Sequence, residues 1–593
     1  MILQSLNHLY ERLSKDPSYG LPTPGYSVQK VTFCIVLHPD GRLHAIEDAR
    51  ETVSETNKKG VVKTRQFPRQ MLVPGDAKPP GQGINPCHLW DNTAYLLGYK
   101  KDDAKPERSL ECFTESRTQH KSFELVINDP GYSAVCRFFE TWSPEKAFEW
   151  KNQLDDFAAT GFGVFRILGQ QSYVHESEAF TRWWVAQNGA TDSSRTEGMC
   201  LVTGQLAPIA RLAEPAIKGV NGAAPGGAKL ASFNLDAFES YGKEQTFNSP
   251  VSEQATFQYC NALNALLSGP QSRRHRVTIG DATTVFWTER ETVAELLFAK
   301  FLGGDIEEKQ SSGDDPVMHA RLEAFLNTLR KGGGTLPVEL GDPDTKFFIL
   351  GLSGNVTRLS VRFWHVGTVA QMIGRLRSHF DALRIQPSRA SDPEFPAVWA
   401  LLRQTGRETK DIPPLLGGNL MQAILNGTSY PHTFYNAILS RIRADHEINY
   451  LRACAIKAFL VRQSKIQIPM SLDTTRTEPA YLLGRLFAAL EKTQEDALPG
   501  INATIRDRFY GSVSATPGAV FPRLLRTYQH HLSKLEGGQK VNRDRLVQAI
   551  HGALASFPSH LGLEDQGLFA IGYYHQRQDF FTKKDKPETK TEQ

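Results

Sequence analysis

The chain has 593 residues, of which 40% are hydrophobic and 22% charged, and its formal net charge is +4. This length exceeds what one hydrophobic core supports and predicts two to four domains of roughly 150 residues each. The composition is that of a folded globular protein and excludes extensive disorder. No run of about 18 apolar residues occurs, so no membrane span is expected. The first 13 residues lack the regions of a signal peptide, which predicts a cytoplasmic protein.

Residues 1–370 combine predicted helices and strands. Residues 1–13 have the pattern of a short amphipathic helix, and two apolar runs flank Asp40-Gly41, a strong β-hairpin signal. Residues 58–86 are polar and rich in Gly, Pro and Lys, so we expect a long exposed loop there. Further strands are predicted at 163–168, 199–203, 277–279, 284–287, 347–352 and 358–364.

Apolar and polar residues alternate in the last of these strands. Leu359, Val361 and Phe363 fall on the face that is predicted to join the core. The other face presents Arg358 and Arg362. A solvated sheet surface explains these two guanidiniums as well as contact with RNA does.

The pattern becomes helical from residue 368 onward. Apolar residues recur at spacings of three and four after Thr477 and again after Val520, with Gly and Pro breaks between them. This pattern predicts an α-helical bundle over 371–580. The expected fold class is therefore α+β, an irregular mixed α/β N-terminal domain (1–370) followed by the bundle, with a disordered tail at 581–593.

Sequence motifs for catalysis or metal binding are absent. The seven cysteines form no CxxC pair, so we expect packing residues and no zinc ribbon. No phosphate loop and no HExxH pattern occurs, and Asp281 is a single carboxylate without a partner. The sequence therefore predicts no cofactor, no metal and no enzymatic activity. A nuclease with dispersed acidic residues remains an alternative.

Positive charge is concentrated in one C-terminal segment. Residues 441–545 contain 17 basic and 10 acidic residues, so the rest of the chain is slightly acidic. Such a local excess is typical of a phosphate-binding surface. A solvated helical surface explains the charge alone equally well.

A glycine-rich stretch bounded by Lys218 and Lys229 is the other candidate for ligand contact. Glycines allow close approach of a backbone to a ligand, and lysines supply charge. The stretch leads into Ser, Asn, Gln and Tyr side chains up to Gln245, which can read base edges or stack. An ordinary surface loop is the alternative.

Several segments together resemble the large subunit of the subtype I-C CRISPR Cascade complex. They run in order through nearly the whole chain: MILQSLNHLYERL (1–13), NPCHLWDNTAYLLGY (85–99), CLVTG (200–204), KGVNGAAPGGAKLASFNLDAFESYGKEQ (218–245), IGDATTVFW (279–287), ILGLSGNVTRLSVRFW (349–364), INATIRDRFYGSVSATPGAVFPRLLRTYQHHLSKL (501–535) and EDQGLFAIGYYHQRQ (564–578).

This resemblance implies a non-catalytic protein that binds nucleic acid. The N-terminal domain of such subunits contacts the guide 5′ end and the complex backbone and recognises the protospacer-adjacent motif in double-stranded DNA. The bundle holds the displaced strand, and a helicase-nuclease is recruited. The implied partners are crRNA, target DNA, the backbone, guide 5′-end and small subunits, and the helicase-nuclease, with no membrane.

The chemistry of the side chains supplies candidates for these contacts. Motif and DNA contacts are predicted for Lys218, Asn221, Gly222, Lys229, Asn234, Lys243 and Gln245, and for Lys59, Lys63, Arg65, Gln66, Arg69, Gln70, Gln82 and Asn85. Contacts to the displaced strand are predicted for Arg441, Arg443, Arg452, Arg506, Arg508, Arg523 and Arg526.

The resemblance also implies an internal translation start. The small subunit of this subtype resembles a separate product that is translated from inside the large-subunit gene and comprises the last helical bundle, here from about residue 470. Met470 lies just before the predicted helix after Thr477. An ordinary loop methionine is the alternative.

Two different classes of protein compete with this interpretation of the whole chain. One is a metal-dependent nuclease, which would need clustered acidic residues. The second is a structural scaffold that never touches DNA.

Overall fold

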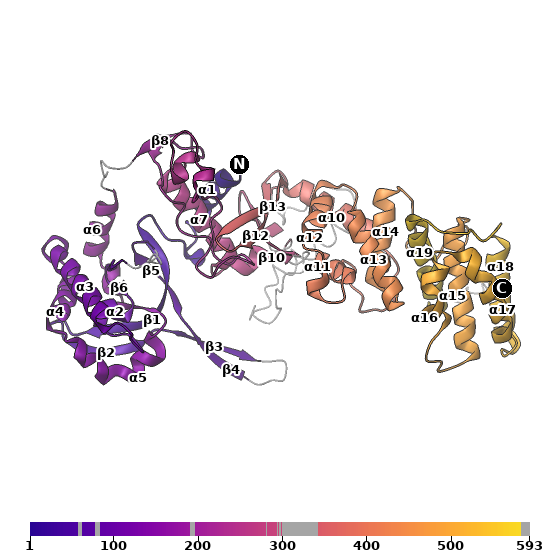
Figure 1. The fold of residues 1–593 in the computed structure, drawn as a ribbon, viewed down its shortest axis with the longest axis horizontal. Helices are drawn as coiled ribbons and strands as arrows, with labels where there is room; N and C mark the ends of the chain where they lie inside the picture. The colour runs from indigo at the N-terminus through magenta and orange to yellow at the C-terminus, as the bar shows by residue number, and fades with distance from the viewer. Residues whose placement is uncertain are drawn as a thin grey trace, which may run out of the picture. The chain divides into compact units, whose positions relative to one another are not determined.

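A computed structural model gives the fold of the chain (Figure 1). It describes residues 1–56, 62–76, 83–189, 196–279, 281–292, 294–295, 298 and 342–582, so the predicted tail from 583 to 593 lies outside the described residues. The chain divides into two compact units. Unit 1 comprises Met1–Gly219 and Pro225–Gln271, and unit 2 comprises Val220–Ala224 and Ser272–Gln593. The expected α+β class is confirmed.

The main sheet of unit 1 is built around β1 (Tyr26–Leu37). Strands β2 (Leu43–Asp48) and β5 (Arg69–Pro74) pair with it antiparallel, and β7 (Phe162–Ile167) pairs with it parallel and carries β6 (Trp90–Asp91). The predicted hairpin at Asp40-Gly41 is confirmed. Gly41 has φ +90°, and a Cβ there would lie 2.6 Å from Cβ of Arg137, so this turn requires glycine.

Both faces of β1 are buried. Phe33, Ile35 and Leu37 pack in one core with helices α3 (Pro106–Ile127) and α4 (Pro130–Thr141), and Cys34 and Val36 pack in another with Trp90 of β6. A strand with two buried faces needs a nearly continuous apolar run. This explains why the sequence from residue 31 to 37 lacks a polar alternation.

The remaining elements of unit 1 surround this sheet. They are α1 (Ile2–Leu13), which packs on α7 (Glu253–Ser268), α2 (Thr93–Leu97), α6 (Glu178–Gly189), and the two-stranded pairs β3 (Glu51–Thr56) with β4 (Val62–Phe67) and β8 (Glu197–Met199) with β9 (Leu206–Pro208). The predicted helix at 1–13 is confirmed. The predicted strand at 199–203 is wrong after Met199, because the chain turns at Gly204 (φ +69°), whose N–H donates to the carbonyl oxygen of Cys200 at 2.8 Å.

Unit 2 begins with an antiparallel sheet in chain order. Its strands are β10 (Arg276–Ile279), β11 (Ala282–Thr288), β12 (Lys346–Asn355) and β13 (Arg358–Thr368), as the sequence predicts. The predicted alternation in β13 is wrong at Val361, which is 44% exposed although Leu359 and Phe363 are buried. A register shift opposite Gly351 and Leu352 breaks the alternation.

Helices follow without further strands in the described part of unit 2. They are α10 (Val369–Leu383), α11 (Val398–Leu402), α12 (Leu416–Asn426), α13 (His432–Asp445), α14 (Tyr450–Gln463), α15 (Pro479–Ala497), α16 (Ile505–Val513), α17 (Pro517–Leu532), α18 (Gly537–Gly552) and α19 (Leu563–Phe581). The change to helical structure thus occurs at Thr368, whereas the two compact units divide between Gln271 and Ser272. The sheet belongs with the helices because Phe347 and Phe363 share one core with Leu376 of α10.

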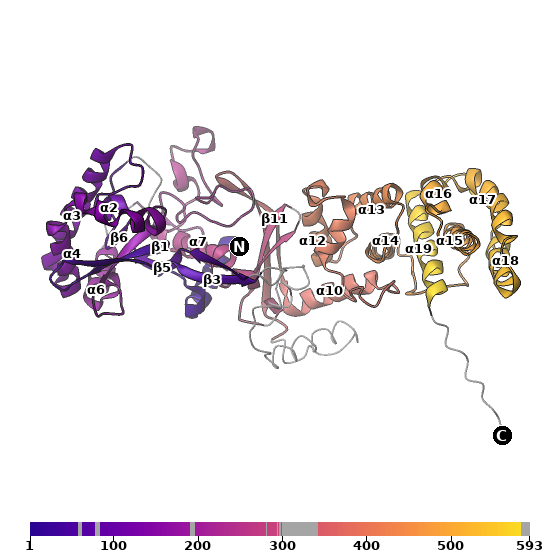
Figure 2. The ribbon, with the colours of Figure 1, turned by 90° about the horizontal axis from the view of Figure 1, so that it is seen from below.

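The last helix, α19, lies between α14 and α15 in both views (Figures 1 and 2). Glycines permit this arrangement. A Cβ on Gly484 of α15 would lie 2.0 Å from the carbonyl oxygen of Phe569, and one on Gly572 of α19 would lie 2.2 Å from that of Tyr481. The two backbones therefore approach more closely than any larger residue allows.

Candidate nucleic-acid interface

The polar stretch at 58–86 contains strands. Residues 62–67 and 69–74 form β4 and β5, so the predicted long loop is wrong over this part. Backbone hydrogen bonds form a ladder whatever the side chains are, and β5 also buries Met71 and Val73. Lys59, Gln82 and the side chain of Lys63 lie outside the described part of the chain.

The candidates on these strands are exposed. Arg65 and Gln66 lie on β4, where their side chains reach solvent. Arg69 at the start of β5 is partly engaged, because its Nε lies 3.7 Å from Oε1 of Glu51 and its guanidinium donates to the hydroxyl of Tyr173 at 3.4 Å. Arg65 and Gln66 are therefore more accessible to DNA than Arg69, whose guanidinium already has partners within the protein.

Two candidates that are far apart in sequence are each related to Lys30, one through strand pairing and the other through its charge. Lys30 of β1 is the cross-strand partner of Gln70 on β5, and its charge acts on Lys218. Burial and the neighbouring Lys30 charge lower the pKa of Lys218, although Glu214 opposes this shift. Both lysines keep exposed surface although the Lys218 side chain is partly covered, and two like charges that act on each other favour an anionic partner.

The glycine-rich stretch is divided between the two units. Asn221 and Gly222 belong to unit 2, where the N–H of Asn221 donates to Oγ1 of Thr283 at 3.0 Å and its carbonyl oxygen accepts from the N–H of Gly354 at 2.9 Å. Lys229 belongs to unit 1 and forms an ion pair with Glu214 at 2.5 Å. The candidates of this stretch therefore contribute to the folds of two different units.

The segment that ends at Gln245 is an exposed loop of unit 1. Asn234 and Lys243 are exposed, and Gln245 accepts a hydrogen bond from the guanidinium of Arg211 at 3.0 Å. Near Lys243, Tyr241 is 98% exposed and has φ +58°. A bulky residue in this backbone conformation is uncommon, and such residues cluster at functional sites.

Asp445 binds two of the seven candidate arginines. Arg441 and Arg452 both form ion pairs with its carboxylate, and Arg452 also donates to the carbonyl oxygen of Glu447 at 2.8 Å. Burial raises the pKa of Asp445, but its hydrogen bonds to the two arginines lower it overall. The Arg452 side chain is 7% exposed. Arg452 therefore stabilises the connection between α13 and α14 and cannot reach a phosphate.

Arg506 is also engaged within the protein. Its Nε lies 3.7 Å from Oε1 of Glu491, a carboxylate on α15 with no exposed surface. Thr504 donates to the same oxygen at 2.7 Å, and the hydroxyl of Tyr573 donates to the other. A buried carboxylate requires such partners. Arg506 therefore serves the fold of the bundle.

The other candidate arginines are exposed. Arg508 lies on α16, and Arg523 and Arg526 lie on α17, three residues apart on one exposed face. Arg523 stacks over the ring of Phe509 at 5.5 Å, and neither Arg508 nor Arg526 forms an ion pair within the described residues. Arg443 is exposed and donates to the side chain of Gln566 at 2.7 Å.

Comparison with known proteins identifies the family. Residues 6–581, from α1 to the end of α19, match the family described as CRISPR-associated protein (Cas_Csd1). The chain belongs to this family. The family is the large Cascade subunit of type I-C, so the chain is a component of a complex with crRNA and other Cas subunits. No curated protein matches the chain.

The structure adds Lys30 to the candidates and draws attention to Tyr241, which the sequence already suggests for stacking. Lys30 is hidden in the sequence because it directly precedes the apolar run from 31 to 37 and carries no signal of its own. Tyr241 does have a signal, because an aromatic residue followed by Gly242 and flanked by polar residues indicates an exposed turn. Both belong to unit 1, as do Gln70 and Lys218.

The described residues contain no group of three His, Cys, Asp or Glu side chains that could hold a metal ion. No helix among them combines the length and apolarity that a bilayer span requires. All seven cysteines are free, and all but Cys87 are buried, as expected for packing residues.

Proposed function

We propose that this Cascade subunit recognises the protospacer-adjacent motif in double-stranded DNA through unit 1. The observation that carries the proposal is the sheet pairing of Lys30 with Gln70, together with the effect of the Lys30 charge on Lys218; all three residues are exposed. The lysines would neutralise backbone phosphates, and amide side chains such as Gln70 and Gln66 would contact base edges in a groove. The minor groove offers a degenerate code, which suits a short and tolerant motif.

In the cytoplasmic complex, these contacts would help to separate the two strands of the target DNA. Exchange of a DNA duplex for an RNA–DNA duplex is nearly balanced in free energy, so modest protein contacts can determine its direction. Arg508, Arg523 and Arg526 would bind phosphates of the displaced strand and stabilise the R-loop. The subunit would then recruit the helicase-nuclease and would break no covalent bond itself.

The motif proposal is tested in the assembled complex with the double variant Lys30→Glu/Lys218→Glu. We expect weaker binding to a target with flanking duplex and a salt slope that is lower by about 0.9 for each lysine. Binding to a target without flanking duplex should be unchanged. Lys15→Glu/Lys146→Glu, which changes two exposed lysines elsewhere in unit 1, is the matched control. Equal losses in both variants, or on both targets, contradict the proposal.

The absence of catalysis is tested with the purified chain alone. We expect plasmid DNA to stay intact with Mg²⁺ or Mn²⁺. The proposal is contradicted if the chain degrades plasmid DNA in the presence of metal and one point substitution abolishes this activity without preventing assembly of the complex. That result would support the nuclease alternative.

A further inference from the structure

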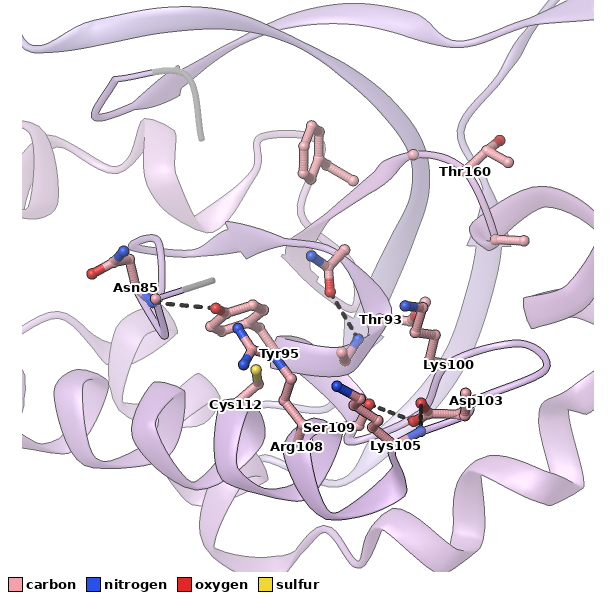
Figure 3. Close-up of a pocket in the computed structure, with 17 residues that line it drawn as sticks. Asn85, Thr93, Tyr95, Lys100, Asp103, Lys105, Arg108, Ser109, Cys112 and Thr160 are labelled. Atoms are coloured by element: carbon pink, nitrogen blue, oxygen red, sulfur yellow. Dashed lines mark hydrogen bonds between the residues drawn. The ribbon is translucent and has the colours of Figure 1, made fainter. Parts of the chain in front are cut away.

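Unit 1 contains a cleft whose lining residues include neither Lys30 nor Lys218. It has a volume of about 760 Å³ and lies between α2, the start of α3 and the start of β7 (Figure 3). This volume is in the range of about 300–1,000 Å³ that is typical of small-molecule sites. One nucleotide fits such a space, and a duplex does not.

The charge of the cleft is predominantly positive. Lys100, Lys105 and Arg108 line it, and Asp103 is the one carboxylate among its lining residues. The oxygens of Asp103 are already engaged, because Oδ1 accepts from the N–H of Lys105 at 2.9 Å and Oδ2 accepts from the hydroxyl of Ser109 at 2.6 Å. Asp103 therefore orders the loop before α3, and cations outnumber carboxylates three to one among the lining residues.

The loop that carries Lys100 and Lys105 packs against the segment between Pro144 and Asp155. At its start, a Cβ on Gly98 (φ +67°) would lie 2.8 Å from Pro144, which shows close packing. The hydroxyl of Tyr99 donates to Oδ1 of Asp155 at 2.7 Å, and Nζ of Lys101 donates to the carbonyl oxygen of Asp155 at 3.2 Å. Anchoring of this kind reduces the ordering that ligand binding would require.

The walls offer contacts for a base as well as for a phosphate. Phe162 at the start of β7 is aromatic and half-buried, and Asn85 lies at the opposite end from Lys100 (Figure 3). Aromatic rings stack on bases of any sequence, and an amide can bond to a base edge. Phosphate-binding and base-binding groups thus occur in one cleft.

We propose that this cleft binds one nucleotide of a single-stranded nucleic acid, with Lys100, Lys105 and Arg108 on its phosphates and the base toward Phe162 and Asn85. This inference rests on the proposed function, because it concerns a further contact of the same nucleic-acid-binding subunit. A base in a duplex is stacked and cannot enter such a cleft, so the ligand is unpaired or extruded. The guide RNA and the opened target DNA are the two sources of such a strand.

The test uses the full chain in the assembled complex. One arm carries 4-thiouridine in the guide RNA, and the other carries 4-thiothymidine in the target DNA, and crosslinked peptides are mapped by mass spectrometry. We expect crosslinks to residues 85–112 in one arm, and that arm identifies the strand. The absence of crosslinks to this segment in both arms overturns the proposal.

Variants separate a charge effect from a folding effect. Lys100→Ala/Lys105→Ala/Arg108→Ala should abolish the crosslink and lower the salt slope for that strand by about 0.7 per cation. Arg117→Ala/Lys146→Ala/Lys151→Ala removes three exposed cations of unit 1 that do not line the cleft, and it should retain the crosslink. Lys100→Arg/Lys105→Arg should retain the crosslink as well. Equal loss in the cleft and control variants overturns the proposal.

Failure of this inference is distinguishable from failure of motif recognition. The alanine variant of the cleft should lose the crosslink but should still bind more tightly to a target with flanking duplex, because its Lys30 and Lys218 are unchanged. A complex in which flanking duplex has no effect, but which still crosslinks through the cleft, contradicts motif recognition alone.

Discussion

Gly222 and Gly354 lie face to face in unit 2. A Cβ on Gly222 would lie 2.6 Å from the carbonyl oxygen of Gly354, and a Cβ on Gly354 would lie 2.2 Å from the backbone nitrogen of Ala223. The N–H of Val356 donates to the carbonyl oxygen of Gly222 at 3.1 Å. The glycine that the sequence suggests for approach to a ligand is therefore used for contact between two backbone segments of the chain.

Gly222→Ala should destabilise unit 2 without any nucleic acid present. The overlap with Gly354 and the positive φ of +81° predict a loss of about 1–3 kcal/mol in the free energy of unfolding. Urea unfolding of the purified chain measures it. Gly226→Ala is the matched control from the same stretch, because a Cβ there has no neighbour within 4 Å. Equal stability of the two variants would show that the contact is dispensable.

Substitution of the candidate arginines should divide them into two classes. Arg508→Ala/Arg523→Ala/Arg526→Ala should lower the salt slope of target binding by about 0.7 per cation, because these side chains are exposed. Arg452→Ala should leave the slope unchanged but reduce the free energy of unfolding by about 1–3 kcal/mol, because it removes a buried partner of Asp445. Titrations at several salt concentrations and urea unfolding measure the two quantities. An unchanged slope in the triple variant would refute the assignment of these arginines to the displaced strand.

Stability of unit 1 should fall in mild acid. Burial lowers the pKa of His120 from its ordinary value of 6.5 to about 4. Its Nε2 accepts from the N–H of Leu89 at 2.9 Å, which leaves Nδ1 as the donor to the carbonyl oxygen of Ser116 at 2.7 Å, so the ring is neutral when folded. Below about pH 6.5 the unfolded chain binds a proton that the folded chain does not, and stability decreases as pH falls toward about 4.

His120→Gln should therefore weaken the pH dependence. The slope between about pH 6.5 and 4 should decrease by about 1.4 kcal/mol per pH unit, whatever the effect of the substitution near neutral pH. Hydrogen exchange of unit 1 amides across this range measures it. His8→Gln changes an exposed histidine of α1 and should keep the slope of the unaltered chain. An identical slope in all three proteins would exclude this role of His120.

The internal translation start at Met470 stays a prediction, and the structure shows which helices the short product would contain. Met470 is 48% exposed in the connection between α14 and α15, and a product that begins there contains α15–α19. Met470→Ala at the codon level should abolish the short product in cells, as detected with an antibody to the C-terminal bundle. Synonymous changes at Pro469 and Ser471 should preserve it. An undiminished short product in the alanine variant would reject Met470 as the start.

Periodic patterns explain which parts of the fold are predictable. The helix at 1–13, the hairpin at Asp40-Gly41, the strands of unit 2 and the helices after Thr477 follow from local apolar spacing and turn residues. The loop prediction at 58–86 is wrong at 62–67 and 69–74, because polar side chains give no sign that the backbone there pairs with a neighbouring strand. The prediction for Val361 is wrong because a bulge depends on the partner strand.

Residue types in their order along the chain are enough to establish the fold class, the family resemblance and the pool of cationic and amide side chains. Which of these side chains are available is a property of the folded chain. Folding pairs Arg452 with Asp445 and Arg506 with Glu491, exposes Lys218 to the charge of Lys30, and forms the cleft at Lys100. Availability of a charge depends on burial and on partners distant in sequence, and no local pattern contains either quantity.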